Sequence, residues 1–346
     1  MHAEAFALSA VASVRAVASR SPERAAEFAA RWEIPAWHAD YRELAARPDV
    51  DVVCVAAPNY LHRDIAVAAA HAGKHVICEK PLARTLREAD EMIAACREAG
   101  VKLMYAEEIC FAPMYVRAKE LADEGALGDV YLVRQSEQHY GPHSDWFWDP
   151  DLAGGGVLMD MGCHGIEFAR WVHGKPAARS VSAEVGTFVH GQRTKAEDHA
   201  IITVRFDGRR VGLIEASWAR PGGMDDRAEI AGSRGVTYAD LVRGSSLSTF
   251  SDVGYGYAVE KAPDTRGWTV TASDELWNSG LPQEMDHFAR CVAGDAVPRE
   301  TGEDGRVVLE IIYAAYRAAR LGRVELPLQL TDEEAAQPPF AQLNPG

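Results

Sequence analysis

Two stretches of the sequence place acidic and basic side chains where they could move a proton. V-I-C-E-K-P-L-A at 76–83 is an apolar run that ends in Glu79 and Lys80. G-G-G-V-L-M-D-M-G-C-H at 154–164 carries Asp160 and His164 at i and i+4, which puts them on one face of a helix. An aspartate that orients a histidine is a common way to build a general base. The same patterns also fit a strand end that reaches water and an Asp–His pair on a helix surface.

Polar residues follow three of the expected strands, at the point where each strand ends. They are S-R at 19–20, A-P-N-Y-L-H at 57–62 and E-K-P at 79–81. In a doubly wound sheet, ligands bind beyond the carboxyl ends of the parallel strands. Three such ends in one sheet predict a shared cleft, with Lys80 at its mouth.

The first 107 residues alternate between strand and helix patterns, which predicts a Rossmann-like parallel sheet with helices on both faces. D-V-V-C-V-A-A at 51–57 lacks polar alternation, as expected for a strand buried on both faces. Ser21 and Pro22 suit the start of a helix, and Gly73 suits the end of another. The expected strands are 14–19, 51–57, 75–78 and 101–106, and the expected helices are 24–31, 61–72 and 86–99.

After about residue 128 the pattern changes to strands with few helices between them. The expected strands are D-V-Y-L-V-R-Q-S-E-Q-H-Y, R-S-V-S-A-E-V-G-T-F-V, H-A-I-I-T-V-R-F and V-G-L-I-E-A-S-W, with a hairpin turn at D-G 207–208. Helices are expected at 156–172, 282–293 and 301–321. The sequence therefore predicts an α/β protein, with a parallel-sheet domain at 1–107. A second α/β domain, at 108–346, has a large open, mostly antiparallel sheet.

Composition excludes several classes of protein. The 346 residues carry 36 basic and 51 acidic side chains, a net charge of −15, and no basic run. This charge disfavours nucleic acid and anionic membrane surfaces as partners, and no apolar run approaches the roughly 20 residues that span a bilayer. The six cysteines are scattered singly, so neither a metal site nor a disulfide framework is predicted. We expect a reducing, cytoplasmic setting.

Several motifs together resemble the Gfo/Idh/MocA family, which includes glucose–fructose oxidoreductase and inositol dehydrogenase. The resemblance covers nearly the whole chain. Its motifs are A-A-P-N-Y-L-H, H-A-G-K-H-V-I-C-E-K-P-L-A, D-M-G-C-H after a glycine run, E-G-A-L-G-D-V and T-G-E-D-G-R-V-V-L-E-I-I-Y-A-A-Y-R-A-A-R-L-G-R. It implies hydride transfer between NAD or NADP and a hydroxyl or carbonyl of a sugar, polyol or inositol-like substrate. It also implies a homo-oligomer, a dimer or a tetramer, assembled through the second domain.

The resemblance assigns roles to individual residues. Lys80 is implied to be the catalytic lysine, with Asp160 and His164 as the acid/base pair. The cofactor pocket is implied to include Ala57, Pro58, Asn59, His62, Glu79 and Lys80. Y-A-E-E at 105–108 differs from the family pattern, in which many relatives carry asparagine near this place, so no role is carried over to it.

The chemistry of these residue types agrees with the implied activity. An ammonium near the reacting oxygen stabilises a developing alkoxide. We expect burial to lower the pKa of Lys80, and we expect His164, held by Asp160, to accept the hydroxyl proton. No metal is needed, because a nicotinamide carries the difficult chemistry.

The loop H-Y-G-P-H-S-D-W-F-W-D at 139–149 is predicted to line the substrate cleft, since its side chains could hydrogen-bond and stack on a sugar ring. His143 and Asp145 are the polar candidates, with Trp146 and Trp148 beside them. The two tryptophans equally fit ordinary core aromatics.

Cofactor preference is predicted from Ser19 and Arg20, at the end of the second Rossmann strand. NAD-preferring proteins place an acidic residue here. A hydroxyl and a guanidinium suit a 2′-phosphate instead, so NADP is favoured over NAD. The alternative is a strand end that happens to carry an arginine.

One expected feature is missing from the sequence. A dinucleotide-binding domain begins with a strand and a glycine-rich turn that holds the pyrophosphate, but this chain has no G-x-G-x-x-G. It opens with M-H-A-E-A-F-A-L-S-A, which resembles the helix after that turn. We expect the first strand and turn to lie upstream in a longer natural protein, or else to be truly lost. In either case this chain should bind dinucleotide poorly.

Two other functions stay open on the same fold. One is a regulator that binds dinucleotide without turnover, and the other is a glycosidase that recycles a bound NAD. Steady-state release of reduced cofactor distinguishes a dehydrogenase from both.

Overall fold

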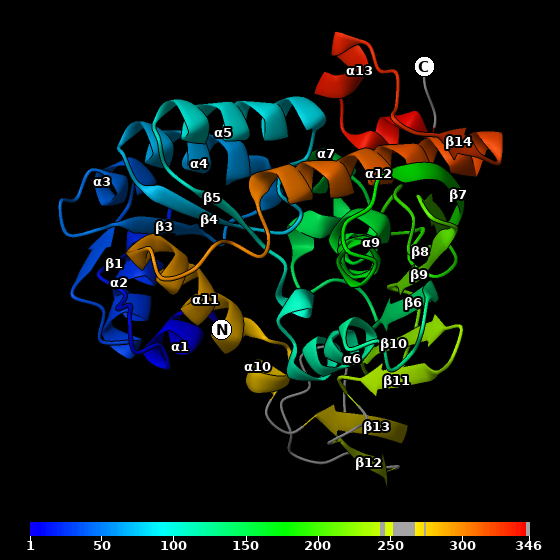
Figure 1. Cartoon of the computed structure of the whole chain (residues 1–346). Helices are drawn as coiled ribbons and strands as arrows, with labels where there is room; N and C mark the ends of the chain where they lie inside the picture. The colour runs from blue at the N-terminus through cyan, green and yellow to red at the C-terminus, as the bar shows by residue number, and fades with distance from the viewer. Residues whose placement is uncertain (243–245, 252–266, 273–274, 344–346) are drawn as a thin grey trace.

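Short parallel strands, most of them followed by a helix, build the N-terminal part of the chain (Figure 1). The structure, a computed structural model, describes residues 1–242, 246–251, 267–272 and 275–343. The strands form a parallel sheet in the order β3-β4-β5 and a separate parallel pair, β1-β2. Their bounds are β1 Ala16–Ala18, β2 Ala36–His38, β3 Val52–Val55, β4 His75–Glu79 and β5 Leu103–Ala106. The helices are α1 His2–Ala7, α2 Pro22–Arg31, α3 Tyr41–Ala45, η1 Asn59–Leu61, α4 His62–His71 and α5 Leu86–Glu98.

The predicted elements of this part are confirmed, with ends that differ by a few residues. Ser21 caps α2 by accepting a hydrogen bond from the Arg24 N–H at 3.3 Å, and Pro22 is the first helical residue, as expected. The predictions omit β2 and α3, because three and five residues are too few to give a periodic pattern. The expected upstream strand and glycine-rich turn concern residues before this sequence, so they stay a prediction.

A seven-stranded sheet dominates the second part of the chain, in the order β11-β10-β6-β9-β8-β7-β14. Only β6 and β9 pair in parallel, so the predicted mostly antiparallel sheet is confirmed. The strands are β6 Val130–Gln138, β7 Ala178–Gly186, β8 His199–Phe206, β9 Arg210–Ser217, β10 Asp225–Gly232, β11 Val236–Asp240 and β14 Val324–Glu325. A separate antiparallel pair consists of β12 Ser246–Ser251 and β13 Gly267–Ala272.

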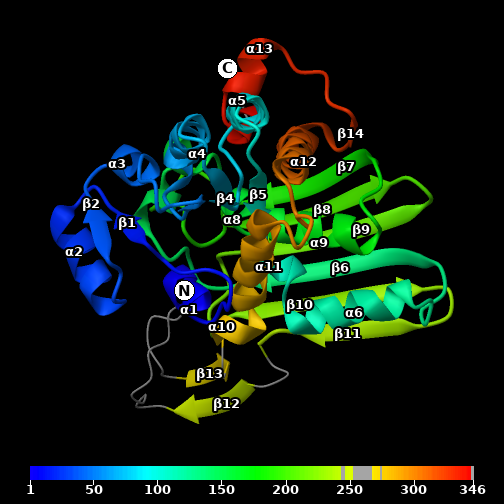
Figure 2. The same ribbon diagram turned by 60° about the vertical axis from the view of Figure 1, so that its left-hand side comes forward.

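Helices pack across one face of this sheet (Figure 2). Helix α12 lies on β7, α9 on β9 and β6, and α6 on β10 and β11. Helix α12 begins with a capping box, in which the Thr301 side chain accepts from the Asp304 N–H. The remaining helices of this part are η2 Glu108–Cys110, α6 Pro113–Asp123, η3 Asp145–Trp148, α7 Pro150–Ala153, α8 Val157–Asp160, α9 Gly162–Val172, α10 Glu275–Asn278, α11 Leu281–Ala293, α12 Gly302–Leu321, α13 Asp332–Ala336 and η4 Pro339–Gln342.

The helix expected at 156–172 is broken into α8 and α9 at Met161. The Asp160 carbonyl accepts from Lys80 Nζ at 2.9 Å and from Cys163 Sγ at 3.2 Å. The His164 N–H donates to the Met161 carbonyl instead, at 3.2 Å. The break therefore makes a backbone carbonyl available to a residue from the first sheet.

The two parts of the chain pack against each other through late helices. Helix α11 contacts α1, and α12 contacts α5 (Figure 1). The chain thus returns to the N-terminal part after the large sheet, and the boundary between residues 107 and 108 stays a prediction. Among the described residues, the helices are too short or too polar to cross a membrane.

Candidate active site

A cavity of about 460 Å³ lies where the ends of β3 and β4 meet the large sheet. Of the three strand ends predicted to share a cleft, those of β3 and β4 line this cavity, whereas the residues after β1 do not, because β1 pairs in a separate sheet. Its wall includes Ala57, Pro58, Asn59, Glu79, Lys80, Glu108, Glu137, His143, Trp146, Asp160, His164 and Asp226. Residues from both parts of the chain therefore face one space.

Lys80 and Asp160 form a contact across this cavity. Lys80 Nζ lies 2.9 Å from the Asp160 carbonyl oxygen and 3.3 Å from its carboxylate Oδ1. The other carboxylate oxygen, Oδ2, accepts from Trp218 Nε1 at 3.1 Å. Burial alone would raise the pKa of Asp160, but Lys80 and nearby histidines lower it to about 2. The carboxylate is therefore ionised and fixed at both oxygens.

The predicted lowering of the Lys80 pKa is wrong. Burial does favour the neutral amine, but the surrounding negative groups, Asp160 first among them, raise its pKa well above the usual value. Lys80 is a charged ammonium at neutral pH. It can donate a hydrogen bond and supply positive charge, but it is not poised to release a proton.

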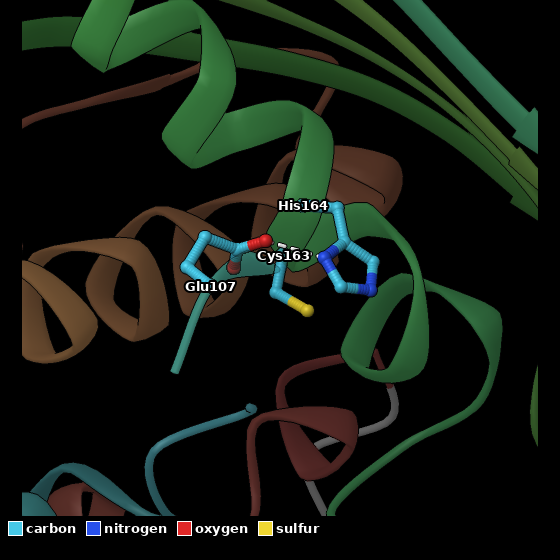
Figure 3. A group of neighbouring side chains, drawn as sticks. All are labelled: Glu107, Cys163 and His164. Atoms are coloured by element: carbon cyan, nitrogen blue, oxygen red, sulfur yellow. Dashed lines mark hydrogen bonds and ion pairs between the residues drawn. The ribbon is translucent and has the colours of Figure 1, made fainter. Parts of the chain in front are cut away.

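His164 is oriented by Glu107 and not by Asp160, which corrects the predicted pairing. The His164 Nδ1 atom contacts the Glu107 carboxylate, which lies between β5 and η2 (Figure 3). Both side chains are buried. The correction follows from the break at Met161, because the Asp160 side chain contacts Lys80 and Trp218 instead.

This contact sets the protonation of His164. Burial would lower its pKa, but Glu107, with Glu108 and Glu137 further away, raises it to about 10 despite the opposing charge of Lys80. The ring is an imidazolium at neutral pH. It can donate a proton, and it can act as a base only after it has lost one. Its Nε2 lies 3.9 Å from Glu137 Oε2 at the cavity wall.

Two groups of side chains in the described residues have the spacing of metal ligands. Glu107, Cys163 and His164 bring one ligand atom each within 4.8 Å (Figure 3). However, the Cys163 thiol donates to the Asp160 carbonyl, and burial raises its pKa well above the usual value, so it stays protonated. In the other group, Glu167, Glu300 and Asp304 surround Lys175 Nζ at 2.8–3.5 Å. Neither group suits a metal ion, and the absence of a metal stays a prediction.

Most of the predicted cofactor residues face the cavity, but His62 does not. Ala57, Pro58, Asn59 and Glu79 line it, and Asn59 Nδ2 donates to the Ala153 carbonyl at 2.8 Å. His62 is fully buried, with Nδ1 3.0 Å from the Pro81 carbonyl and Nε2 2.8 Å from the Ala57 carbonyl. It hydrogen-bonds the loop after β3 and the loop after β4, and it does not line the cavity.

The Glu79 carboxylate is already engaged at both oxygens. Its Oε1 contacts His2 Nε2 at 2.7 Å, and Oε2 accepts from the Lys80 N–H at 3.0 Å. Burial would raise its pKa, but His2 and Lys80 lower it to about 2.

Ser19 and Arg20 stand at the carboxyl end of β1, outside the cavity lining. The Ser19 hydroxyl accepts from the Ser21 N–H at 3.4 Å, and Arg20 is exposed. Arg20 is thus accessible to a ligand that extends past β3 toward β1.

The loop at 139–149 contributes half of its predicted substrate residues. His143 and Trp146 line the cavity, whereas Asp145 and Trp148 do not. Asp145 is fully exposed near Arg193, and Trp148 packs on Trp218 with a centroid distance of 5.6 Å. The segment is the 3₁₀ helix η3, in which residues i and i+3 share a face, so 145 and 148 point away together.

Four carboxylates at the site were not assigned from the sequence. Glu107 and Glu108 follow β5, Glu137 is on β6, and Asp226 is on β10. The Y-A-E-E sequence drew attention to the first two without a role. Glu137 had no local signal beyond its place in an expected strand, and Asp226 had none because β10 reads as a polar stretch, D-D-R-A-E-I-A-G.

The site and fold define a dinucleotide-dependent oxidoreductase, and comparison with known proteins gives the family. Residues 1–107 match the family model for the oxidoreductase family NAD-binding Rossmann fold, and residues 115–238 match the GFO/IDH/MocA C-terminal domain. A trans-1,2-dihydrobenzene-1,2-diol dehydrogenase of Xenopus laevis is 33% identical over 286 residues, covering 81% of each chain. The myo-inositol 2-dehydrogenase of Thermotoga maritima is 28% identical, covering 92% of each chain. The chain belongs to the Gfo/Idh/MocA family, as its motifs predicted.

Solved structures agree in fold over nearly the whole chain. GenD2 from gentamicin A biosynthesis, in complex with NAD, has a TM-score of 0.86 and 33% identity, covering 94% of this chain and 93% of that one. A levoglucosan dehydrogenase in complex with NADH and levoglucosan has a TM-score of 0.78 and 27% identity, covering 94% and 96%. The α/β fold with a Rossmann-like part and a large mixed sheet is therefore confirmed.

Replacing Glu107 tests the origin of the His164 charge. In Glu107→Gln the His164 pKa should fall from about 10 toward or below the ordinary 6.5, because burial then acts without its main counter-charge. In the wild type the raised pKa adds stability that is complete below pH 6.5 and is lost as pH rises through about 10. Glu107→Gln should remove this pH dependence.

Histidine NMR titration and urea unfolding against pH measure both effects. Glu108→Gln is the matched control, since its Oε2 lies 3.9 Å from His164 Nδ1 and its effect should be smaller. An unchanged His164 pKa in Glu107→Gln would show that another group holds the proton.

Proposed function

We propose that this chain is an NAD(P)-dependent dehydrogenase or reductase. It would transfer a hydride between the nicotinamide and a hydroxyl or carbonyl of a sugar, polyol or inositol-like substrate. The observation that carries the proposal is the convergence of Lys80, Asp160 and His164 on one cavity at the ends of β3 and β4. The family's dehydrogenases, including the inositol and levoglucosan enzymes above, support the substrate class.

The cavity fits the nicotinamide end of such a cofactor. Its wall at the strand ends is formed by backbone and small side chains of Ala57 and Pro58, with Asn59 and Glu79 beside them. A bound nicotinamide would supply or accept the hydride. The protein's own part is to hold the reacting carbon beside Lys80 and His164 and to manage the proton on its oxygen.

The charge state of the site favours proton transfer from His164 to the substrate oxygen at neutral pH. At neutral pH the His164 imidazolium can donate to a carbonyl oxygen as it is reduced, while Lys80 stabilises the developing negative charge. Oxidation of an alcohol needs the neutral ring, so its rate should rise with pH toward about 10, the pKa of His164. Asp160 keeps Lys80 at the reacting oxygen by fixing its ammonium.

Removing either cation should abolish most of the turnover. In Lys80→Ala the alkoxide loses its counter-charge, and in His164→Ala it loses its proton donor. Each variant should lose roughly 10²-fold or more in kcat, the usual scale of general acid–base catalysis. Nicotinamide absorbance, with a panel of polyols and sugars and both NAD⁺ and NADP⁺, measures the loss.

Lys74→Ala and His71→Ala are controls outside the cavity, on the turn before β4 and at the end of α4. They should keep wild-type kcat. If Lys80→Ala or His164→Ala does the same, while melting shows all four variants folded, the assignment is wrong.

We also propose that NADP is preferred over NAD. The exposed Arg20 guanidinium at the end of β1, with the Ser19 hydroxyl beside it, suits a 2′-phosphate. Arg20→Ala should lower the ratio of NADP to NAD affinity by roughly tenfold, in line with a charge-assisted hydrogen bond. Calorimetric titration measures both constants, with Arg15→Ala at the opposite end of β1 as the control. A ratio that Arg20→Ala leaves unchanged would remove Arg20 from cofactor selection.

A homo-oligomer, a dimer or a tetramer, is proposed from the outer face of the large sheet. Ile201, Val236 and Tyr238 are exposed on strands whose opposite face is covered by helices. Light scattering should give a mass of two or four chains, and Tyr238→Glu should lower it. A single-chain mass in the wild type would contradict this. The six unpaired cysteines support the proposed cytoplasmic setting.

A further inference from the structure

Two carboxyl groups lie directly opposite each other on neighbouring strands at the cavity wall. Asp226 on β10 is the register partner of Glu137 on β6, and both side chains point to the helix-covered face. Like charges in such a pair repel. Burial first, and then Glu137, raise the pKa of Asp226 to about 8. Asp226 is therefore shifted toward its protonated form near neutral pH.

Glu137 has no hydrogen-bond donor among the described residues, although its side chain is only 9% exposed. Among the described residues, its nearest cation is His164, whose Nε2 lies 3.9 Å from Glu137 Oε2. A buried carboxylate is costly unless it is paired and hydrogen-bonded. Glu137 therefore faces the cavity with unused acceptor capacity.

The Asp226 carboxyl group also accepts fewer hydrogen bonds than it could. Tyr115 OH at 2.5 Å and Gln135 Nε2 at 3.2 Å both donate to Oδ1. Among the residues that the structure describes, none donates to Oδ2. One oxygen of this group is open toward the same space as Glu137.

Neither Lys80 nor His164 donates a hydrogen bond to this pair. Lys80 is held by Asp160, and His164 is held by Glu107 through its other ring nitrogen. Glu108, a further carboxylate of the wall, has a buried Oε2 with no hydrogen-bond partner in the described chain. The cavity wall on this side thus carries several carboxylate oxygens that accept no hydrogen bond from the described residues.

We propose that Glu137 and Asp226 bind an ammonium group of the substrate, so that the enzyme acts on amino sugars or aminocyclitols in preference to their neutral hydroxyl analogues. This inference rests on the proposed function and names its substrate class. Because Glu137 lies beside His164 Nε2, the amino group would be on the sugar or cyclitol ring, at a carbon close to the reacting carbon. An ammonium with three donors matches the open carboxylate oxygens better than a hydroxyl with one.

Matched ligand pairs test the proposal. Binding of 2-amino-2-deoxy-D-glucose, its N-acetyl derivative and D-glucose is measured by calorimetry near pH 7, as is scyllo-inosamine against scyllo-inositol. Turnover is followed in parallel with NAD⁺ and NADP⁺. In the wild type each amine should bind roughly tenfold or more tightly than its hydroxyl analogue, the scale of a charge-assisted hydrogen bond. The neutral N-acetyl compound should lose this advantage.

Variants locate the effect. Glu137→Gln should bring the amine-to-hydroxyl ratio within about threefold of one, because it removes a charge and keeps the shape. Asp226→Asn should lower the ratio less, since this carboxyl is partly protonated. Glu184→Gln, an exposed site on β7 outside the cavity, should leave the ratio unchanged. Thermal melting checks that each variant is folded.

The outcomes separate the two claims. Equal binding of amines and hydroxyl analogues by the wild type overturns the ammonium site, even if polyols are oxidised. An amine preference that survives in both Glu137→Gln and Asp226→Asn overturns it as well. An amine preference that depends on Glu137 without any turnover supports the site and contradicts the dehydrogenase.

Discussion

The contact between Lys80 and Asp160 is the constraint on which the site depends. It joins a strand end of the first sheet to a helix break of the second part, with Nζ 2.9 Å from a carbonyl and 3.3 Å from a carboxylate oxygen. Both side chains are largely removed from water, so each charge is stabilised by the opposite charge of its partner. Because the carbonyl comes from the break between α8 and α9, the local shape of the second part and the position of Lys80 are fixed together.

Two charged pairs then divide the work of the site. In the proposed reaction, Lys80 and Asp160 keep a positive charge where an oxygen anion would form, and Glu107 keeps a proton on His164. This arrangement favours proton donation at neutral pH, whereas a neutral histidine would favour proton removal. Glu137 and Asp226 lie beyond these pairs, on the large sheet, with Glu137 Oε2 3.9 Å from His164 Nε2, where we propose that they act on substrate binding.

Local sequence features predicted much of the fold and part of the site. Ser21, Thr301 and the glycines after helices marked element ends, and the family motifs identified Lys80, Asp160 and His164 correctly as neighbours of one cavity. These features depend on residues close in sequence or on a strand ending at a known edge of a sheet.

The rest depends on long-range geometry that spacing cannot show. Glu107 meets His164 across 57 positions, and the register of β6 against β10 brings Glu137 opposite Asp226 across 89. The i,i+4 spacing of Asp160 and His164 indicated a direct pair, which the break at Met161 prevents. Burial predicted a lower Lys80 pKa, but the number of surrounding carboxylates decided the opposite sign.

Transfer of deuterium from substrate to nicotinamide tests the central claim most directly. The best substrate of a polyol and amino-sugar panel, deuterated at its ring carbons, is incubated with enzyme and oxidised cofactor, and the reduced cofactor is examined by NMR. We expect one deuterium at nicotinamide C4, on a single face of the ring. Product that forms with no deuterium in released cofactor, or label that returns to the same sugar, would contradict it.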